Sequence, residues 1–412
     1  MKRPVNFSKD NLSVQWQYVN RNLKDMGLWK LVETRVKLTI KGTIELMVQK
    51  EFDMTLASSK YERTGNRIDY RSGYYQRFIG TTHGKVEISM PKARRTPVKY
   101  GLFKKYQRRQ EQFDDNILKA MILGLTGRKQ KKFFKSFIGD SVSHTTASKI
   151  IGKIGCLVNY YRNMPLSDEY EYLYLDAIWV HVKELNIKSR PILVALGVKS
   201  DGSKHILTFK LAKSESEAEW LGLINDLYRR GLKGLKLNLI ISDNCGGLKS
   251  AINYVYPYTA LQLCTVHKLR NVLSKINNKT ENRKKVMNHA CKIFKSQTKA
   301  EAFVRYKKFI RNWSIKEPRV VKTMKNDIEY YFTYFNFAEE KRNLLKSTNP
   351  LERINRELRK VSRRYGYFQS QRSLDIFIYL TLKEDGLITN RDFEVMPEQK
   401  QNLPFLEFAN KS

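Results

Sequence analysis

The stretch EYLYLDAIWVHVK, residues 171–183, constrains the fold most. Apolar residues occupy both sides of its two-residue alternation, as in a strand that is covered on both faces. RPILVALGVKS and SKHILTFKLA follow, with Ser-Asp-Gly at 200–202 as the turn between two further strands. A helix is predicted at 214–232 and another buried strand in LKLNLIISDNCGG, residues 235–247. Three strands, a helix and a further strand predict a mixed α/β sheet.

Helical patterns flank this sheet on both sides. From Lys268 to about Phe337 the pattern stays helical, long enough for a separate helical insertion. Upstream, residues 113–158 are also predicted to be helical and end in SVSHTTASKIIGKIG. Short helices closed by one with a polar face are typical of a helix-turn-helix, although any small helical bundle has the same periodicity. The residues of that polar face are His144, Thr145, Ser148 and Lys149.

The sequence of the N-terminal third predicts fewer defined elements. Residues 1–60 mix short apolar segments with charges and predict no defined element. GKVEISMPKARR, residues 84–95, predicts a strand that ends at Pro91 and continues into a basic arm. Nine Lys or Arg residues and one acid lie between Lys85 and Arg109. This arm is either a solvated loop or a phosphate-contacting segment that uses Arg94 and Arg95.

Charge indicates the class of partner. The chain has 77 Lys plus Arg against 40 Asp plus Glu, a net charge of +37. Such a surplus favours a polyanionic partner, and nucleic acid is the first candidate. An anionic membrane is a weaker alternative because we find neither a polybasic amphipathic helix nor a lipidation signal.

Other classes are not expected. The first twenty residues lack the apolar core of a signal peptide, and no run of 18 apolar residues predicts a membrane span. Four scattered cysteines indicate reduced thiols, so we expect a cytoplasmic protein that joins the nucleoid when bound to DNA. GLTGRK, which begins at residue 124, lacks the spacing of a phosphate-binding loop, and ATP is not expected.

Two aspartates stand out in the predicted sheet. Asp176 lies inside the apolar run LYLDAIWV, where an unpaired carboxylate costs several kcal/mol. Asp243 ends the strand LIISD, at the edge where open α/β sheets bind ligands. Each also has an ordinary alternative, which is a salt bridge for Asp176 and a turn for Asp243.

A third carboxylate opens a helix at STNPLERINRELRK, residues 347–360. With Asn349 as the N-cap and Pro350 in the first helical position, Glu352 would close a capping box. Residues three, four and seven positions later share the helical face of Glu352. Glu352 could therefore also form a surface ion pair with an arginine on this face. These three residues are Asn355, Arg356 and Arg359.

Taken together, the carboxylates suggest one chemistry. Asp176, Asp243 and Glu352 would form a hard-oxygen ligand set suited to Mg²⁺ or Mn²⁺. Two such ions about 4 Å apart can activate a hydroxyl and stabilise the leaving oxygen of a phosphodiester. The metals would let carboxylates approach a phosphate, while basic residues such as Lys268, Arg270, Arg356 and Arg359 hold the DNA.

The C-x-x-H pair Cys264 and His267 has three possible roles. With His289 and Cys291 it could in principle bind zinc. It could instead be a buried cysteine with a hydrogen-bonded histidine. In the third, His267 lies near the scissile phosphate.

Several of these motifs resemble one family when read in order. LYLDAIWVHVK, IISDNCGGLKSAI, QLCTVHKLRNVL and STNPLERINRELRK, together with GYYQRFIGTTHGKVEISMPKARR upstream, are similar to the Mutator-type insertion-sequence transposases over residues 60–390. The resemblance implies a ribonuclease-H-like catalytic domain with an α-helical insertion. It implies a catalytic triad of Asp176, Asp243 and Glu352, a C-x-x-H motif at Cys264 and His267 with His267 near the phosphate, and a basic residue at Arg359.

The expected organisation follows. We expect a basic DNA-binding region at 1–110, a helix-turn-helix-like domain at 111–165, a catalytic core at 166–260 and 346–395, a helical insertion at 261–345 and a tail at 396–412. The expected function is a DDE transposase that binds terminal inverted repeats and cuts and joins DNA as a homodimer or larger assembly. The alternatives are a metal-dependent nuclease and a catalytically silent DNA-binding regulator.

Overall fold

The computed structural model describes most of the chain. The described residues are 28–103, 108–123, 125, 129, 132–135, 144–183, 187–276, 283–368 and 370–388. They form two compact units, residues 1–150 and residues 151–412, and the boundary falls within one helix. The predicted tail at 396–412 and part of the helical region predicted at 113–158 lie outside the described residues.

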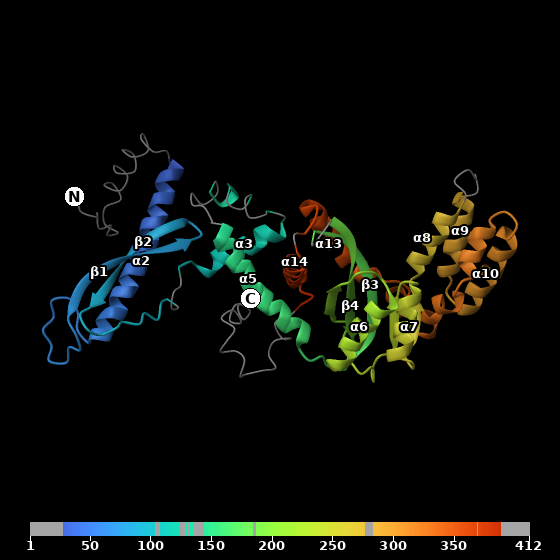
Figure 1. Cartoon of the computed structure of the whole chain (residues 1–412), viewed down its shortest axis with the longest axis horizontal. Helices are drawn as coiled ribbons and strands as arrows, with labels where there is room; N and C mark the ends of the chain where they lie inside the picture. Colours follow the sequence, from blue (N-terminus) through green and yellow to red (C-terminus); the bar gives the residue numbers. More distant parts are fainter. Residues whose placement is uncertain are drawn as a thin grey trace. The chain divides into compact units, whose positions relative to one another are not determined.

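The N-terminal unit contains a long helix where the sequence predicted none. Helix α2, Leu28–Leu56, packs on a hairpin of β1, Arg71–Thr81, and β2, Gly84–Ala93 (Figure 1). Its inward residues recur every four positions, from Ile40 through Ile44 to Val48. The helix was missed because large apolar residues also face outward; Leu46, for example, is 59% exposed.

Strand β2 is longer than predicted. It continues through Pro91 to Ala93 instead of ending at the proline. The described sheet pairs β2 with β1 alone, so a residue without an N–H is tolerated in this two-stranded sheet. The carbonyl of Pro91 accepts the Tyr100 hydroxyl at 2.6 Å.

A second cluster completes this unit. Helix α3, Glu111–Ile122, and the start of α5, His144–Asn163, contribute to a core of Phe113, Ile117, Ala120, Phe134 and Ile150. Helices were predicted in this region. Whether they form a helix-turn-helix stays a prediction, because much of the connecting segment lies outside the described residues.

The second unit contains the predicted mixed α/β sheet. Its order is β5-β4-β3-β6-β7, with β3–β4 and β4–β5 antiparallel and β3–β6 and β6–β7 parallel. The strands are β3, Tyr170–Lys183; β4, Ile187–Lys199; β5, Lys204–Leu211; β6, Leu239–Ser242; and β7, Ala260–Leu263.

Most of these strands were predicted from the sequence, and the observed strands differ from the prediction in two places. The turn at 200–202 is present, and Gly202 has the φ of +82° that such a turn needs. Strand β6 is confined to four residues of the predicted 235–247. Strand β7 was not predicted, because its four residues run at once into a helix and are too few to show a period.

Helices cover the two faces of this sheet. Helices α6, Glu217–Arg229, and α7, Gly246–Val255, contact each other beside the strands. Helix α13, Asn349–Tyr365, lies against β3 and is followed by α14, Gln371–Glu384 (Figure 1). Successive residues of β3 point to opposite faces, so its neighbours alternate between these two groups.

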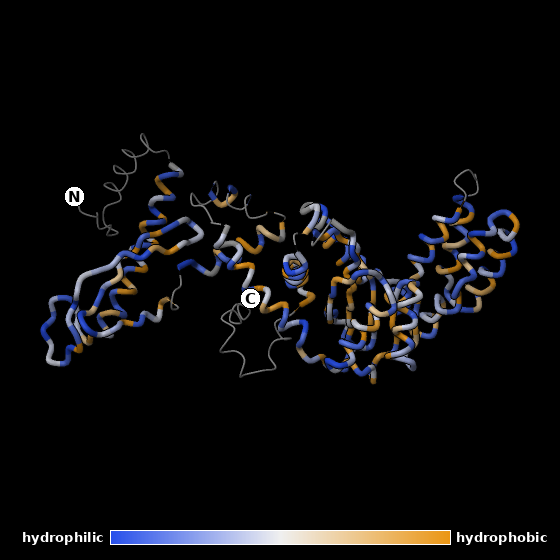
Figure 2. Tube along the Cα trace, viewed as in Figure 1, coloured by the Kyte–Doolittle hydropathy of each residue, from blue (hydrophilic) through white to orange (hydrophobic). Residues whose placement is uncertain are grey.

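A helical segment separates β7 from α13. It begins at Thr265, because residues 261–263 of the predicted insertion belong to β7. Its apolar and polar residues alternate along α8 to α10 (Figure 2), as expected for helices with one inward face. It comprises α8, Thr265–Lys275; α9, Arg283–Phe294; α10, Lys299–Trp313; α11, Pro318–Lys325; two 3₁₀ turns, Ile328–Tyr331 and Thr333–Asn336; and α12, Glu339–Leu345. No helix in the described part of the chain is long and apolar enough to cross a membrane.

Candidate active site

The two sheet aspartates occupy equivalent positions on neighbouring parallel strands. The last paired residues of β3 and β6 are Leu175 and Ser242. Asp176, within β3, and Asp243, just after β6, follow them directly. Asp176 is buried, whereas the side chain of Asp243 is 39% exposed. The site therefore has one buried and one accessible carboxylate.

Helix α13 brings a polar side chain to Asp176. Asn355 donates its amide hydrogen to the Asp176 carboxylate at 2.7 Å and is itself 1% exposed. Burial raises the pKa of Asp176 to about 6, even though the nearby His267 lowers it. The backbone N–H of Ala177 is a second donor to this carboxylate, at 2.9 Å. Two neutral donors compensate the charge of a buried carboxylate only in part.

Glu352 lies one helical turn before Asn355. The helix begins at Asn349, and the carbonyl of Thr348 accepts the amide hydrogen of Glu352 at 3.0 Å. Thr348, not Asn349, therefore holds the cap position, because the helix starts one residue earlier than predicted. The Glu352 carboxylate pairs with Arg270 at 2.7 Å instead of closing the predicted capping box.

The C-x-x-H motif ties the start of α13 to the sheet. Cys264 follows β7, is 1% exposed, and its sulfur lies 3.4 Å from both the amide and the hydroxyl of Thr348. Next to it, Thr265 donates through its amide and its hydroxyl to the carbonyl of Lys346. These contacts fix the residues that lead to Glu352.

His267 connects this motif to the aspartates. Burial opposes its charge, but hydrogen bonding to Cys264 and the Asp243 and Asp176 carboxylates raise its pKa to about 9. Its Nδ1 lies 3.7 Å from an Asp243 oxygen. Zinc binding with His289 is not supported, because His289 Nδ1 instead accepts the Trp313 indole N–H at 3.2 Å.

The carboxylates fit a hard divalent cation by their chemistry. Within the described ranges no three His, Cys, Asp or Glu side chains converge closely enough to hold a metal, and Glu352 is paired with Arg270. However, the Oδ1 atom of Asn355 is buried without a hydrogen-bond partner beside Asp176. An orphaned oxygen next to a buried carboxylate suits a hydrated cation such as Mg²⁺.

The predicted DNA contacts divide into exposed and buried residues. Lys268 is buried: it is 2% exposed, its ammonium donates to the Asn326 carbonyl at 2.5 Å, and it lies 4.4 Å from the centre of the Tyr331 ring. Its prediction as a DNA contact is therefore not supported. The side chain of His144 lies outside the described residues, and exposed side chains are found at Arg94, Arg95, Thr145, Ser148, Lys149, Arg270, Arg356 and Arg359.

A basic cleft opens next to Asp243. It has a volume of about 700 Å³ and extends from Asn244, along α8, to α11. Its only acidic lining residue is Asp327, which is paired with Lys249 at 2.8 Å. The cleft is therefore strongly positive. Its cationic lining residues are Lys268, Lys275, Arg319, Lys322 and Lys325.

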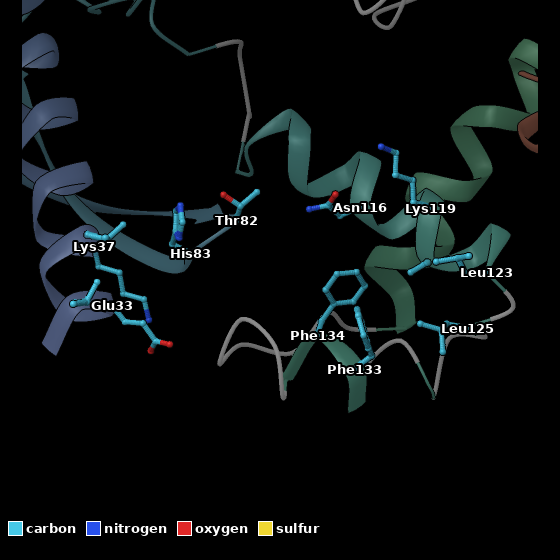
Figure 3. A pocket seen from close by; sticks show the side chains of 13 residues that line it. Glu33, Lys37, Thr82, His83, Asn116, Lys119, Leu123, Leu125, Phe133 and Phe134 are labelled. Atoms are coloured by element: carbon cyan, nitrogen blue, oxygen red, sulfur yellow. The ribbon is translucent and has the colours of Figure 1, made fainter. Parts of the chain in front are cut away.

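The N-terminal unit has a different hollow (Figure 3). It has a volume of about 800 Å³, with leucine and phenylalanine side chains on one side and Glu33, Lys37 and His83 on the other. This mixed lining contains none of the three carboxylates. It is therefore not part of the candidate active site.

Comparison with known proteins decides the family. The sequence model of the Mutator family of transposases matches residues 19–387. The chain belongs to this family. The transposase for insertion sequence element ISRM5 of Rhizobium meliloti (strain 1021) is 31% identical over 322 residues, or 78% of this chain and 80% of the relative. The transposase for IS256 in transposon Tn4001 of Staphylococcus aureus is 29% identical over 388 residues, 91% of this chain and 98% of the relative.

The chain also matches solved structures, and one of these is a crystal structure at low identity. It is the crystal structure of a pre-cleavage Mos1 transpososome, at 10% identity, and the match covers 55% of this chain and 82% of that chain. Its TM-score of 0.16 is too low to establish a common fold. Membership of the Mutator family therefore rests on sequence.

Two features of this Mutator-family chain were missed from its sequence. Asn355 was noted only as a neighbour of Glu352, although its position three residues later already indicated a shared face. The basic residues of α11 were not predicted as part of a site, because a chain with 77 basic residues has basic segments throughout.

Proposed function

We propose that this Mutator-family protein is a DDE transposase that binds the terminal inverted repeats of an insertion sequence, cuts DNA and joins the freed end to a target. The observation that carries this proposal is that Asp176, within β3, and Asp243, just after β6, follow the last paired residues of two neighbouring parallel strands, with α13 bonded to Asp176 through Asn355. The mixed sheet order supports a ribonuclease-H-like core. Family membership supports DNA as the substrate.

The chemistry would consist of two displacements at phosphorus. In the first, a water oxygen bonds to phosphorus, the bond to the 3′ oxygen breaks, and the water proton passes to solvent as the leaving oxygen gains one. In the second, the freed 3′-hydroxyl oxygen attacks a target phosphate in the same way. No bond to the protein forms in either step.

The carboxylates would hold Mg²⁺ or Mn²⁺. Asp176, Asp243 and Glu352 are the proposed ligands, which requires Glu352 to leave Arg270. The bound ions would activate the attacking hydroxyl and offset charge on the phosphate. His267, whose charged form is favoured by Asp243, would supply a cation close to the same phosphate.

The basic cleft would hold the DNA backbone beside the site. Apart from the buried Lys268, its cations on α8 and α11 surround a hollow that begins at Asn244, the residue after Asp243. A strand that leaves the carboxylates along this cleft would meet one positive side chain after another. Arg356 and Arg359, exposed on α13, would contribute on the side of Glu352.

A strand-transfer assay tests this function. The purified chain is incubated with Mg²⁺, labelled DNA from the ends of its own element, and unlabelled target DNA. The proposal predicts both a cut end and a longer joined product. Cutting without joining would indicate a nuclease instead, and binding without cutting would indicate a regulator.

A further inference from the structure

Trp179 is unusually exposed for a tryptophan beside an active site. It is 50% exposed, whereas Trp220 and Trp313 in the same unit are 1% and 5% exposed. It lies on the part of β3 that extends past the last residue paired with β6. By strand alternation it faces the side opposite Asp176.

The indole ring of Trp179 is exposed, but a hydrogen bond holds it in place. Its indole N–H donates to the Glu215 carboxylate at 2.7 Å. Glu215 precedes α6, and burial raises its pKa, with a further contribution from the charge of Asp243. Because one edge of the indole is anchored, the ring keeps its orientation while half of its surface stays in solvent.

The segment that anchors the ring is fastened to the Asp243 loop. The Cys245 thiol donates to the Glu215 carbonyl at 3.3 Å. At Gly247, a Cβ atom would lie 2.5 Å from the backbone nitrogen of Glu217, so the two segments pack as closely as glycine allows. Trp179 is therefore fixed relative to Asp243 through two side chains and this backbone contact.

We propose that Trp179 is a stacking site for an unpaired nucleobase next to the phosphate at Asp243, and that Glu215 is its positioning residue. Stacking on an aromatic side chain contributes about 1–3 kcal/mol per base. The base must leave the stack because neighbouring bases cover both its faces inside a duplex, and an unpaired base leaves at the least cost. This inference rests on the proposed function because it takes DNA as the substrate.

The test measures binding to three short duplexes that differ at one position. The position carries an unpaired 2-aminopurine, a paired 2-aminopurine or an abasic site, and the buffer contains EDTA so that nothing is cut. The native chain should bind the unpaired-base duplex about tenfold more tightly than the abasic duplex, and 2-aminopurine fluorescence should fall. Equal affinities would overturn the proposal.

Variants separate stacking from folding. Trp179→Ala should bind the unpaired-base duplex and the abasic duplex with the affinity that the native chain has for the abasic one. Trp179→Phe should keep most of the preference for the unpaired base. Glu215→Gln should keep it and Glu215→Ala should lose part of it. Tyr258→Ala removes a fully exposed aromatic at 101% and should change nothing. If Trp179→Ala weakened both duplexes equally, or kept the preference, the stacking role would be wrong.

The result is distinguishable from failure of the proposed function. A chain that prefers the unpaired base but never cuts DNA would contradict the proposed function and leave the stacking site standing. A chain that cuts and joins DNA without this preference would do the reverse.

Discussion

Asn355 donates a 2.7 Å hydrogen bond to Asp176, one helical turn after Glu352. This contact joins the helix that carries the third carboxylate to the strand that carries the first. It sets the register of α13 on β3, so the distance between two proposed metal ligands depends on a neutral side chain.

Replacing Asn355 tests that dependence. Asn355→Ala removes the side-chain amide donor of the buried Asp176 and leaves it the Ala177 N–H, which should cost about 1–3 kcal/mol of unfolding free energy. It should also lower the cutting rate, because α13 loses its register. Urea unfolding and a cleavage assay measure the two effects. Asn312→Ala, at an exposed asparagine, is the control, and equal losses in both variants would refute the assigned role.

The ion pair between Arg270 and Glu352 should compete with the metal. Exposed pairs of this kind contribute about 0–1 kcal/mol. Arg270→Gln should therefore lower the Mg²⁺ concentration for half-maximal cutting by up to about fivefold. A Mg²⁺ titration measures this midpoint. Arg311→Gln, at another exposed arginine, should leave the midpoint unchanged, and a rise in Arg270→Gln would contradict the competition.

Lys268 should affect the pH dependence of stability. Burial lowers its pKa from 10.5 to about 8. Between these values the unfolded chain binds more protons than the folded one, so this lysine makes the unfolding free energy rise with pH from about 8 to about 10.5. Chemical unfolding of the native chain and Lys268→Met over this range measures the difference. Identical slopes would show that Lys268 keeps an ordinary pKa.

The basic cleft should dominate the salt dependence of DNA binding. Replacing Arg319, Lys322 and Lys325 by alanine should reduce the slope of log affinity against log salt by up to about 0.9 for each lost phosphate contact. The matched control removes three exposed cations of α10, namely Lys299, Lys307 and Arg311. If both triple variants lose the same slope, the cleft has no special part in binding.

Much of this arrangement was accessible from sequence. Asp176 and Asp243 were recognised because a carboxylate in an apolar strand has few ordinary explanations, and their proximity follows from parallel pairing. The burial of Lys268 and the pairing of Glu352 with Arg270 could not be predicted from the sequence, because both depend on contacts between segments far apart in the chain. Trp179 also gave no signal, since an aromatic residue in a strand is usually buried.

The most direct test of the central claim compares the native chain with Glu352→Gln, Asp176→Asn and Asp243→Asn. Cleavage and joining of labelled element ends are measured with Mg²⁺, and end binding is measured in parallel. The account predicts that each variant binds the ends but yields neither cut nor joined product. If Glu352→Gln still cuts and joins DNA at the native rate, Glu352 is not a metal ligand and the proposed triad is wrong.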